Sequence, residues 1–435
     1  MGLLFKMCDS PIPLFDSVPI NQDIVDKRIE KVAATSLSDK RHFKFEIAGT
    51  DELIDLSKSL ILLKLKVVKA DGTNLDADVE VALINHAGAT LFEKLEIALG
   101  SGQDNVVNID NYGYVGYLEN KLMNSSDYNN TCGTLSGYYE DTPSHFETLN
   151  DNNLGFKARK AMCKNSRIFQ LYSKLHSGVF NQPKPLKSHI DLTLEFTLAD
   201  PDFYIMAPAL NVQNTLKYRV EILEAHLVIK RLKLSNECNI KIEKAFQNNP
   251  IVYQFDRTRA WIKDVDTGLS TISFTDFCNK NDLPKFLMCG FVKENSFAGK
   301  QECNPFNFIP NKVKSINLSK NGTSITGKRL TMDYGRGNFS EAYYQFLESL
   351  GFWDGLEGCS TTPEAFSSGT TIYGFDLSTT CDGLNFVDQI RQGNMEIDVL
   401  FDGDTDQKTK FVVLNIYESQ ISINNMMRVE KNYTS

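Results

Sequence analysis

The sequence lacks the motifs that identify the common enzyme and metalloprotein classes. It contains no glycine-rich dinucleotide fingerprint, no P-loop, no G-x-S-x-G elbow and no H-E-x-x-H zinc motif. Its six histidines stand far apart in the chain, and none has the spacing of a metal-ligand pair. We therefore expect a protein that is not an enzyme, with no catalytic residues, no cofactor and no metal site.

Cysteine is present without any of the patterns that give it a structural role. The nine cysteines are odd in number and widely spaced, and no two of them form a C-x-x-C pair. Neither a zinc site nor a disulfide framework is favoured by this arrangement. We expect reduced thiols, as in proteins of the cytosol or the nucleus.

An excess of positive charge is also missing. The chain has 46 Lys and Arg against 55 Asp and Glu, which gives a net charge of −9, and its basic residues are scattered. This argues against a sequence-specific nucleic-acid partner, because such proteins gather their basic residues on one face. No apolar run approaches the roughly 18 residues of a membrane helix, so we expect no membrane span.

Short segments of alternating apolar and polar residues are what the sequence contains instead. The clearest lies within 189–203, where Leu192, Leu194, Phe196 and Leu198 would share one face of a strand. Other strands are predicted, bounded by Gly-rich, N-G and D-G turns, in 42–49, 53–69, 90–99, 218–234, 250–262, 285–293, 312–327, 370–378, 394–404 and 410–423. We expect "FDGDTDQKTKF" at 401–411 to be the solvated turn of a hairpin between the last two of these strands.

Helices are few in this pattern. The segment 112–123, "YGYVGYLENKLM", is a short helix candidate inside a polar, Asn- and Tyr-rich region of loops from about 105 to 180. In 340–352 Ala342, Phe346 and Leu350 recur at four-residue spacing, and Ser340 is a plausible N-cap. The fold class that follows is all-β, with a β-sandwich in each half of the chain, long inserted loops and a few short helices.

One stretch is too polar for a core strand and too aromatic for an ordinary loop: "SFAGKQECNPFNF", residues 296–308. It forms the centre of "CGFVKENSFAGKQECNPFNFIPNKVKSINLSKNGTSI", which is followed by "LTMDY", "AYYQFLESLG" and "GTTIYGFDLS". In the first half, "FKFEIAGTDELIDLSKSLILLKLKVVKADGT" contains the I-D-L motif at Ile54, Asp55 and Leu56, before "NHAGATLFEKLEIALGSG" and "NYGYVGYLENKL".

The order and content of these segments resemble the double jelly-roll major capsid proteins of Polinton/Maverick elements and adintoviruses, which belong to the adenovirus hexon-like lineage. The resemblance covers about 42–425, and it rests on the shared order because each motif alone is of moderate specificity. It implies two tandem jelly-roll β-sandwiches. We therefore divide the chain into an N-terminal arm (1–37), a first jelly roll (38–235), a second jelly roll (236–425) and a C-terminal tail (426–435).

The function that the resemblance implies is that of a structural subunit. Three chains would form a pseudo-hexameric homotrimeric capsomer, and capsomers would tile an icosahedral virion shell. The implied partners are neighbouring capsomers, penton proteins and minor capsid proteins. The implied location is the virion capsid, with synthesis in the host cytoplasm and assembly there or in the nucleus. A domesticated copy in a host genome would have the same sequence pattern, and a tandem jelly-roll protein that binds or acts on carbohydrate is the alternative from another functional class.

Two groups of aromatic residues are candidates for an interface. Gly299 and Pro305 permit a sharp turn, and the neighbouring phenylalanines could anchor that loop in an apolar contact within or between chains. They could also close the end of their own sandwich, and the tyrosines of 112–117 could pack either on their own sandwich or between the chains of a trimer. The predicted interface residues are Phe297, Pro305, Phe306, Phe308, Tyr112, Tyr114 and Tyr117.

Overall fold

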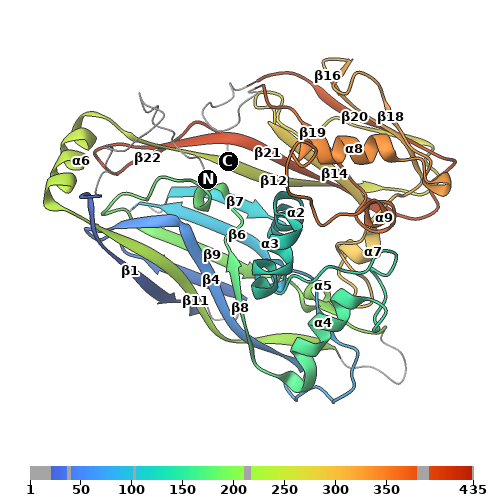
Figure 1. The fold of residues 1–435 in the computed structure, drawn as a ribbon, viewed down its shortest axis with the longest axis horizontal. Coiled ribbons are helices and arrows are strands. Elements are labelled where there is room, and N and C mark those ends of the chain that lie inside the picture. Colours follow the sequence, from blue (N-terminus) through green and yellow to red (C-terminus); the bar gives the residue numbers. More distant parts are fainter. Residues whose placement is uncertain (1–20, 37–40, 101–103, 210–216, 380–390, 434–435) are drawn as a thin grey trace, which may run out of the picture.

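Two β-sandwiches follow one another along the chain in the computed structural model, which describes residues 21–36, 41–100, 104–209, 217–379 and 391–433. Figure 1 shows them side by side, with most of the helices gathered near the region where they meet. Paired strands within these sheets run antiparallel, as a sandwich built from jelly-roll connections requires.

The first sandwich consists of two facing sheets. One has the order β1 (Ile24–Ala33), β11 (Tyr218–Leu234), β4 (Leu53–Lys69) and β8 (Phe169–Lys174). The other has the order β2 (Thr35–Ser36), β3 (His42–Ile47), β9 (Leu192–Leu198), β6 (Phe92–Leu99) and β7 (Asp104–Asp110). In β9 the four apolar side chains predicted to share a face are buried and the residues between them are not, because one face of the strand packs in the core.

The second sandwich repeats this arrangement. One sheet has the path β12 (Ile251–Val265), β21 (Thr409–Ile423), β14 (Phe286–Lys293) and β15 (Phe308–Ile309), with β19 (Ile372–Asp376) and β22 (Val429–Lys431) attached to its strands. The facing sheet has β13 (Thr271–Phe274), β20 (Met395–Phe401), β16 (Val313–Lys320) and β17 (Thr323–Ser324), with β18 (Leu330–Thr331) paired to β16. A two-stranded sheet of β5 (Ala82–Leu83) and β10 (Ile205–Met206) belongs to the first half.

Helices occupy the connections between strands. Those of the first half are α1 (Ala87–Thr90), α2 (Tyr112–Met123), α3 (Ser126–Asn130), η1 (Cys132–Ser136), α4 (Leu154–Cys163), η2 (Lys164–Ser166), η3 (Gly178–Phe180) and α5 (Pro201–Tyr204). Helix α6 (Asn236–Asn248) joins the two halves, and the second half has α7 (Glu294–Phe297), η4 (Tyr334–Arg336), α8 (Ser340–Ser349) and α9 (Pro363–Ser368). Among the described residues, no helix combines the length and apolar character that a membrane crossing needs.

Four local predictions differ from the structure. Residues 24–33, assigned to an N-terminal arm, form strand β1, which pairs with β11 at the edge of its sheet and whose side chains are mostly exposed. The predicted hairpin at 401–411 is wrong, because β20 and β21 lie in different sheets and the turn connects those sheets. Ser340 is the first residue of α8 rather than its N-cap, which is Phe339. Part of the predicted tail pairs with β21 as β22.

Candidate functional site at the junction of the two sandwiches

Helix α2 brings a row of tyrosines to the region where the two sandwiches meet (Figure 1). Tyr117 stacks on Phe306 of the second half, with ring centroids 4.0 Å apart and planes inclined by 6°. Tyr114 meets the edge of Phe306 at 5.4 Å and stacks on Phe297 at 5.3 Å. These rings come from opposite halves of the sequence, so they form an aromatic contact between the sandwiches; Phe297, Phe306, Tyr114 and Tyr117 are called the aromatic junction below.

The segment that follows α7 turns sharply to bring Phe306 to α2. Gly299 has a φ of +77°, and a Cβ there would lie 3.1 Å from the backbone nitrogen of Phe203, so glycine suits both the conformation and the space. The Tyr114 hydroxyl donates a hydrogen bond to the Pro305 carbonyl at 2.9 Å. Burial raises the pKa of the Tyr114 phenol well above its ordinary range, which keeps this donor protonated.

The structure assigns the predicted interface residues to contacts within one chain. Phe308 lies in β15 and packs against Gly290 of the neighbouring strand, so it belongs to the core of the second sandwich. Tyr112 packs its ring edge on Phe196 of the first sandwich, at 5.9 Å. Of the seven residues, Phe297 is half-buried and the other six are buried by their own chain. Those six side chains have almost no surface left for a second chain.

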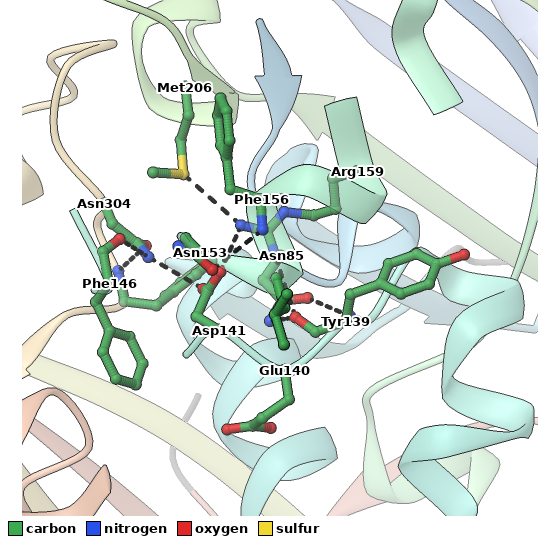
Figure 2. Close-up of polar contacts among 12 residues, drawn as sticks. Asn85, Tyr139, Glu140, Asp141, Phe146, Asn153, Phe156, Arg159, Met206 and Asn304 are labelled. Atoms are coloured by element: carbon green, nitrogen blue, oxygen red, sulfur yellow. Dashed lines mark hydrogen bonds and ion pairs between the residues drawn. The ribbon is translucent and has the colours of Figure 1, made fainter. Parts of the chain in front are cut away.

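Figure 2 shows a buried polar network, which reaches the segment that carries Phe306. Arg159 of α4 donates to the carbonyls of Leu83 and Tyr139, both at 3.0 Å, and its Nη2 lies 2.8 Å from the Asp141 carboxylate. Both charged side chains are only 2% exposed. A buried ion pair is tolerated when its remaining donors and acceptors form hydrogen bonds. Here the two carbonyls accept hydrogen bonds from the guanidinium.

Asn304 extends this network to the second sandwich. Its Nδ2 lies 3.3 Å from the second carboxylate oxygen of Asp141 and 3.0 Å from the Phe146 carbonyl, and Figure 2 shows it facing both. Its Oδ1 accepts a hydrogen bond from the backbone nitrogen of Phe306 at 3.0 Å. The same segment therefore presents one aromatic ring and one amide to the first half of the chain.

The groups at this junction hold the two sandwiches together. The Arg159 guanidinium and the Asp141 carboxylate are engaged and shielded from solvent, which leaves them poorly placed to act on a substrate. In the part of the chain that the structure describes, no three His, Cys, Asp or Glu side chains come together as metal ligands. Sequence reasoning identified the aromatic residues but missed Arg159, Asp141 and Asn304. The only sequence signal was the unusual polarity of 296–308, the segment that contains Asn304. Asp141 lies 163 residues from Asn304, so no local pattern indicated that the two side chains meet.

Comparison with known proteins adds whole-chain evidence on the fold. No protein-family model matches the sequence. A protein of Caenorhabditis elegans described as uncharacterized is 24% identical over 330 residues, which cover 74% of each chain. The Sputnik virophage structure matches 100% of this chain and 94% of its own with a TM-score of 0.67 at 13% identity.

Two further virus structures agree. The quasi-atomic model of the PBCV-1 virus capsid matches 97% of this chain and 100% of its own, with a TM-score of 0.60 at 12% identity. The mavirus major capsid protein matches 100% and 95%, with a TM-score of 0.57 at 9% identity. The chain therefore has the double jelly-roll fold of these capsid proteins, and the predicted fold class is confirmed.

Proposed function

We propose that the chain is a major capsid protein and that three copies form a pseudo-hexameric capsomer. The observation that carries this proposal is the match of the complete chain, both sandwiches in order, to viral capsid proteins. Two similar sandwiches in each chain give six similar lobes in a trimer, and such capsomers can tile an icosahedral shell. The lobes proposed are residues 38–235 and 236–425.

The junction supports this role through its rigidity. A capsomer needs a fixed angle between the two lobes of each subunit, because every lobe must meet a neighbour in the shell. Stacked rings and the hydrogen bond from Asn304 to the buried Asp141 carboxylate fix that angle more tightly than a mobile linker would, since packed interiors resist deformation. A structural subunit of this kind has no requirement for a cofactor or for catalytic residues.

Within the double jelly-roll capsid proteins, we assign the chain to the Polinton/Maverick and adintovirus lineage. This assignment rests on the order of the motifs in the sequence. Neighbouring capsomers, penton proteins and minor capsid proteins are the partners that this assignment implies, and the virion is the location.

Electron microscopy of the purified chain tests the proposal. We expect negative-stain images to show closed shells or separate particles with a hexagonal outline and three-fold symmetry. A monodisperse population of two-lobed single chains at every concentration tested would contradict it. The matched control is the same preparation at high salt and low concentration, where separate capsomers should replace any shells because surface contacts between them are screened.

Carbohydrate binding remains a second candidate because of one exposed aromatic pair. Trp353 is 58% exposed and Tyr344 42% exposed, and their rings meet edge to face at 4.9 Å beside Asp354. Exposed aromatic rings next to a carboxylate are a common platform for sugars. A glycan array probed with the wild type and with Trp353→Ala tests this function. Carbohydrate binding requires that the wild type binds a glycan and that the variant does not.

A further inference from the structure

A chain of buried side chains that the capsid role does not use crosses from the first sandwich to the second. His86 Nδ1 lies 2.7 Å from the Ser136 hydroxyl, and His86 Nε2 lies 2.8 Å from His176 Nε2. His176 Nδ1 lies 3.2 Å from one oxygen of Glu119 on α2, whose other oxygen accepts from the Thr258 hydroxyl of β12 at 2.8 Å. We call these five residues the histidine chain.

Local backbone geometry brings the two rings into contact. His86 has a φ of 59°, in the left-handed region, and it directly precedes α1. Gly116 of α2 leaves space beside the His176 ring, since a Cβ there would lie 2.8 Å from Ala89 and 3.2 Å from the His176 ring. The rings are held at this distance by packing, and His86 is 2% and His176 7% exposed.

The hydrogen bonds of the histidine chain limit how many protons the two rings can take up while they stay in contact. With both rings neutral, the Ser136 hydroxyl donates to His86, His86 Nε2 donates to His176, and His176 Nδ1 donates to the Glu119 carboxylate. One added proton can enter at His86 Nδ1, because the Ser136 hydroxyl also lies 2.8 Å from the Gly133 carbonyl and can donate there instead. A further proton would place N–H groups on both nitrogens of the 2.8 Å contact, so two cationic rings cannot share it.

We propose that the histidine chain is an acid-sensitive contact between the sandwiches, which opens when both rings become cationic and then frees α2 from β12. The inference concerns the folded chain and stands apart from the capsid role. Opening hydrates the rings and lets the two imidazolium groups separate, whereas the closed arrangement excludes the doubly protonated state. Acid therefore favours the open form by mass action.

The groups around the rings set the sign of the effect. Glu119 and Tyr112 face His176 from α2, the Tyr138 ring lies 6.2 Å from the His86 ring, and β12 contributes the neutral hydroxyl of Thr258. Burial, with a smaller contribution from His176, lowers the pKa of His86 well below its ordinary 6.5. The closed form thus takes up its proton less readily than the open form, so closure is favoured above about pH 6.5 and weakens as the pH falls below it.

Hydrogen exchange of the full chain, followed by mass spectrometry and corrected for the intrinsic pH dependence of exchange, measures this opening. One extra proton bound on opening gives up to a tenfold change in the opening equilibrium per pH unit, and with an ordinary pKa of 6.5 in the open form the change is about 16-fold between pH 6.5 and pH 5. We expect peptides from α2 to lose protection from exchange by this factor. Peptides from β9, in the core of the first sandwich, should keep their protection.

Matched variants separate this contact from general acid effects. His86→Gln removes the ring whose pKa burial lowers, so the pH dependence of α2 exchange should disappear. His176→Gln removes the contact between the two rings but leaves the buried His86, so it should reduce the pH dependence. Either variant tests the contact if the other does not fold. His189→Gln is the control, because His189 is 53% exposed and pairs with the exposed Asp51, so it should retain the wild-type response. Equal α2 protection at pH 6.5 and pH 5 in the wild type would overturn the proposal, as would a single-histidine variant that keeps the wild-type response.

Discussion

Replacing Phe306 with alanine tests whether the aromatic junction holds the two sandwiches together. The Phe306 side chain is fully buried, stacks on Tyr117 and meets the rings of Tyr114 and Phe203 edge to face. Removing the ring leaves a cavity between the sandwiches. The surroundings are poorly able to fill it, because the Tyr114 hydroxyl is tied to the Pro305 carbonyl and its ring is held by Phe297.

The expected loss follows from these contacts. Phe→Ala substitutions in protein cores cost about 3–5 kcal/mol of unfolding free energy, and the upper part of that range applies where the site cannot collapse. We therefore expect a loss of about 4 kcal/mol for Phe306→Ala. Phe306→Leu should lose about 1.5 kcal/mol, because leucine refills most of the space.

Urea unfolding followed by circular dichroism, at one fixed protein concentration, measures both values. For Phe306→Ala we also expect the single unfolding transition to separate into two, because the contact that couples the unfolding of the two sandwiches is weakened. Leu356→Ala is the matched control, because Leu356 is fully exposed and should change stability by less than about 0.5 kcal/mol. A Phe306→Ala loss no larger than that of the control would refute the reasoning.

Three further predictions concern other parts of the chain. Asp141→Ala leaves the buried Arg159 guanidinium without its carboxylate, so urea unfolding should show a loss of about 3–5 kcal/mol, and a loss below about 1 kcal/mol would count against the network. Tyr433→Phe removes a hydrogen bond from the C-terminal segment to a carbonyl of β7 and should cost about 1 kcal/mol in thermal unfolding, whereas an unchanged midpoint would show that this bond contributes nothing. Burial raises the pKa of the Cys163 thiol to about 12, so a thiol reagent at pH 8 should label the exposed Cys132 in the native chain and Cys163 only after unfolding, as peptide mass mapping can verify.

The elements that the sequence predicted well are those whose burial imposes a period. β9, β14 and β21 each bury side chains in the core, so their strands were visible in the pattern of apolar residues, and α2 has the predicted bounds Tyr112–Met123. β1 was missed because most of its side chains are exposed on an edge strand, which leaves no alternation to detect. Helix α6 was missed for a similar reason, since Phe246 is its only buried side chain.

The junction was predictable only in part. The aromatic content of 296–308 and of α2 indicated that both segments needed an apolar environment, but local pattern carries no information on which segment faces which. The Tyr117–Phe306 stack and the Asp141–Asn304 bond join segments from different halves of the chain, and such pairings are decided by the tertiary fold. The rings therefore proved to lie between the sandwiches of one chain, where the sequence had also allowed a contact between chains.

The mass of the purified chain in solution, measured by light scattering across a range of concentrations, tests the capsid assignment most directly. We predict a stable species near 147 kDa, three times the 49.0 kDa of one chain, or larger closed assemblies built from it. A species that stays at 49.0 kDa at all concentrations would contradict the assignment, even if the junction between the two sandwiches behaves as described.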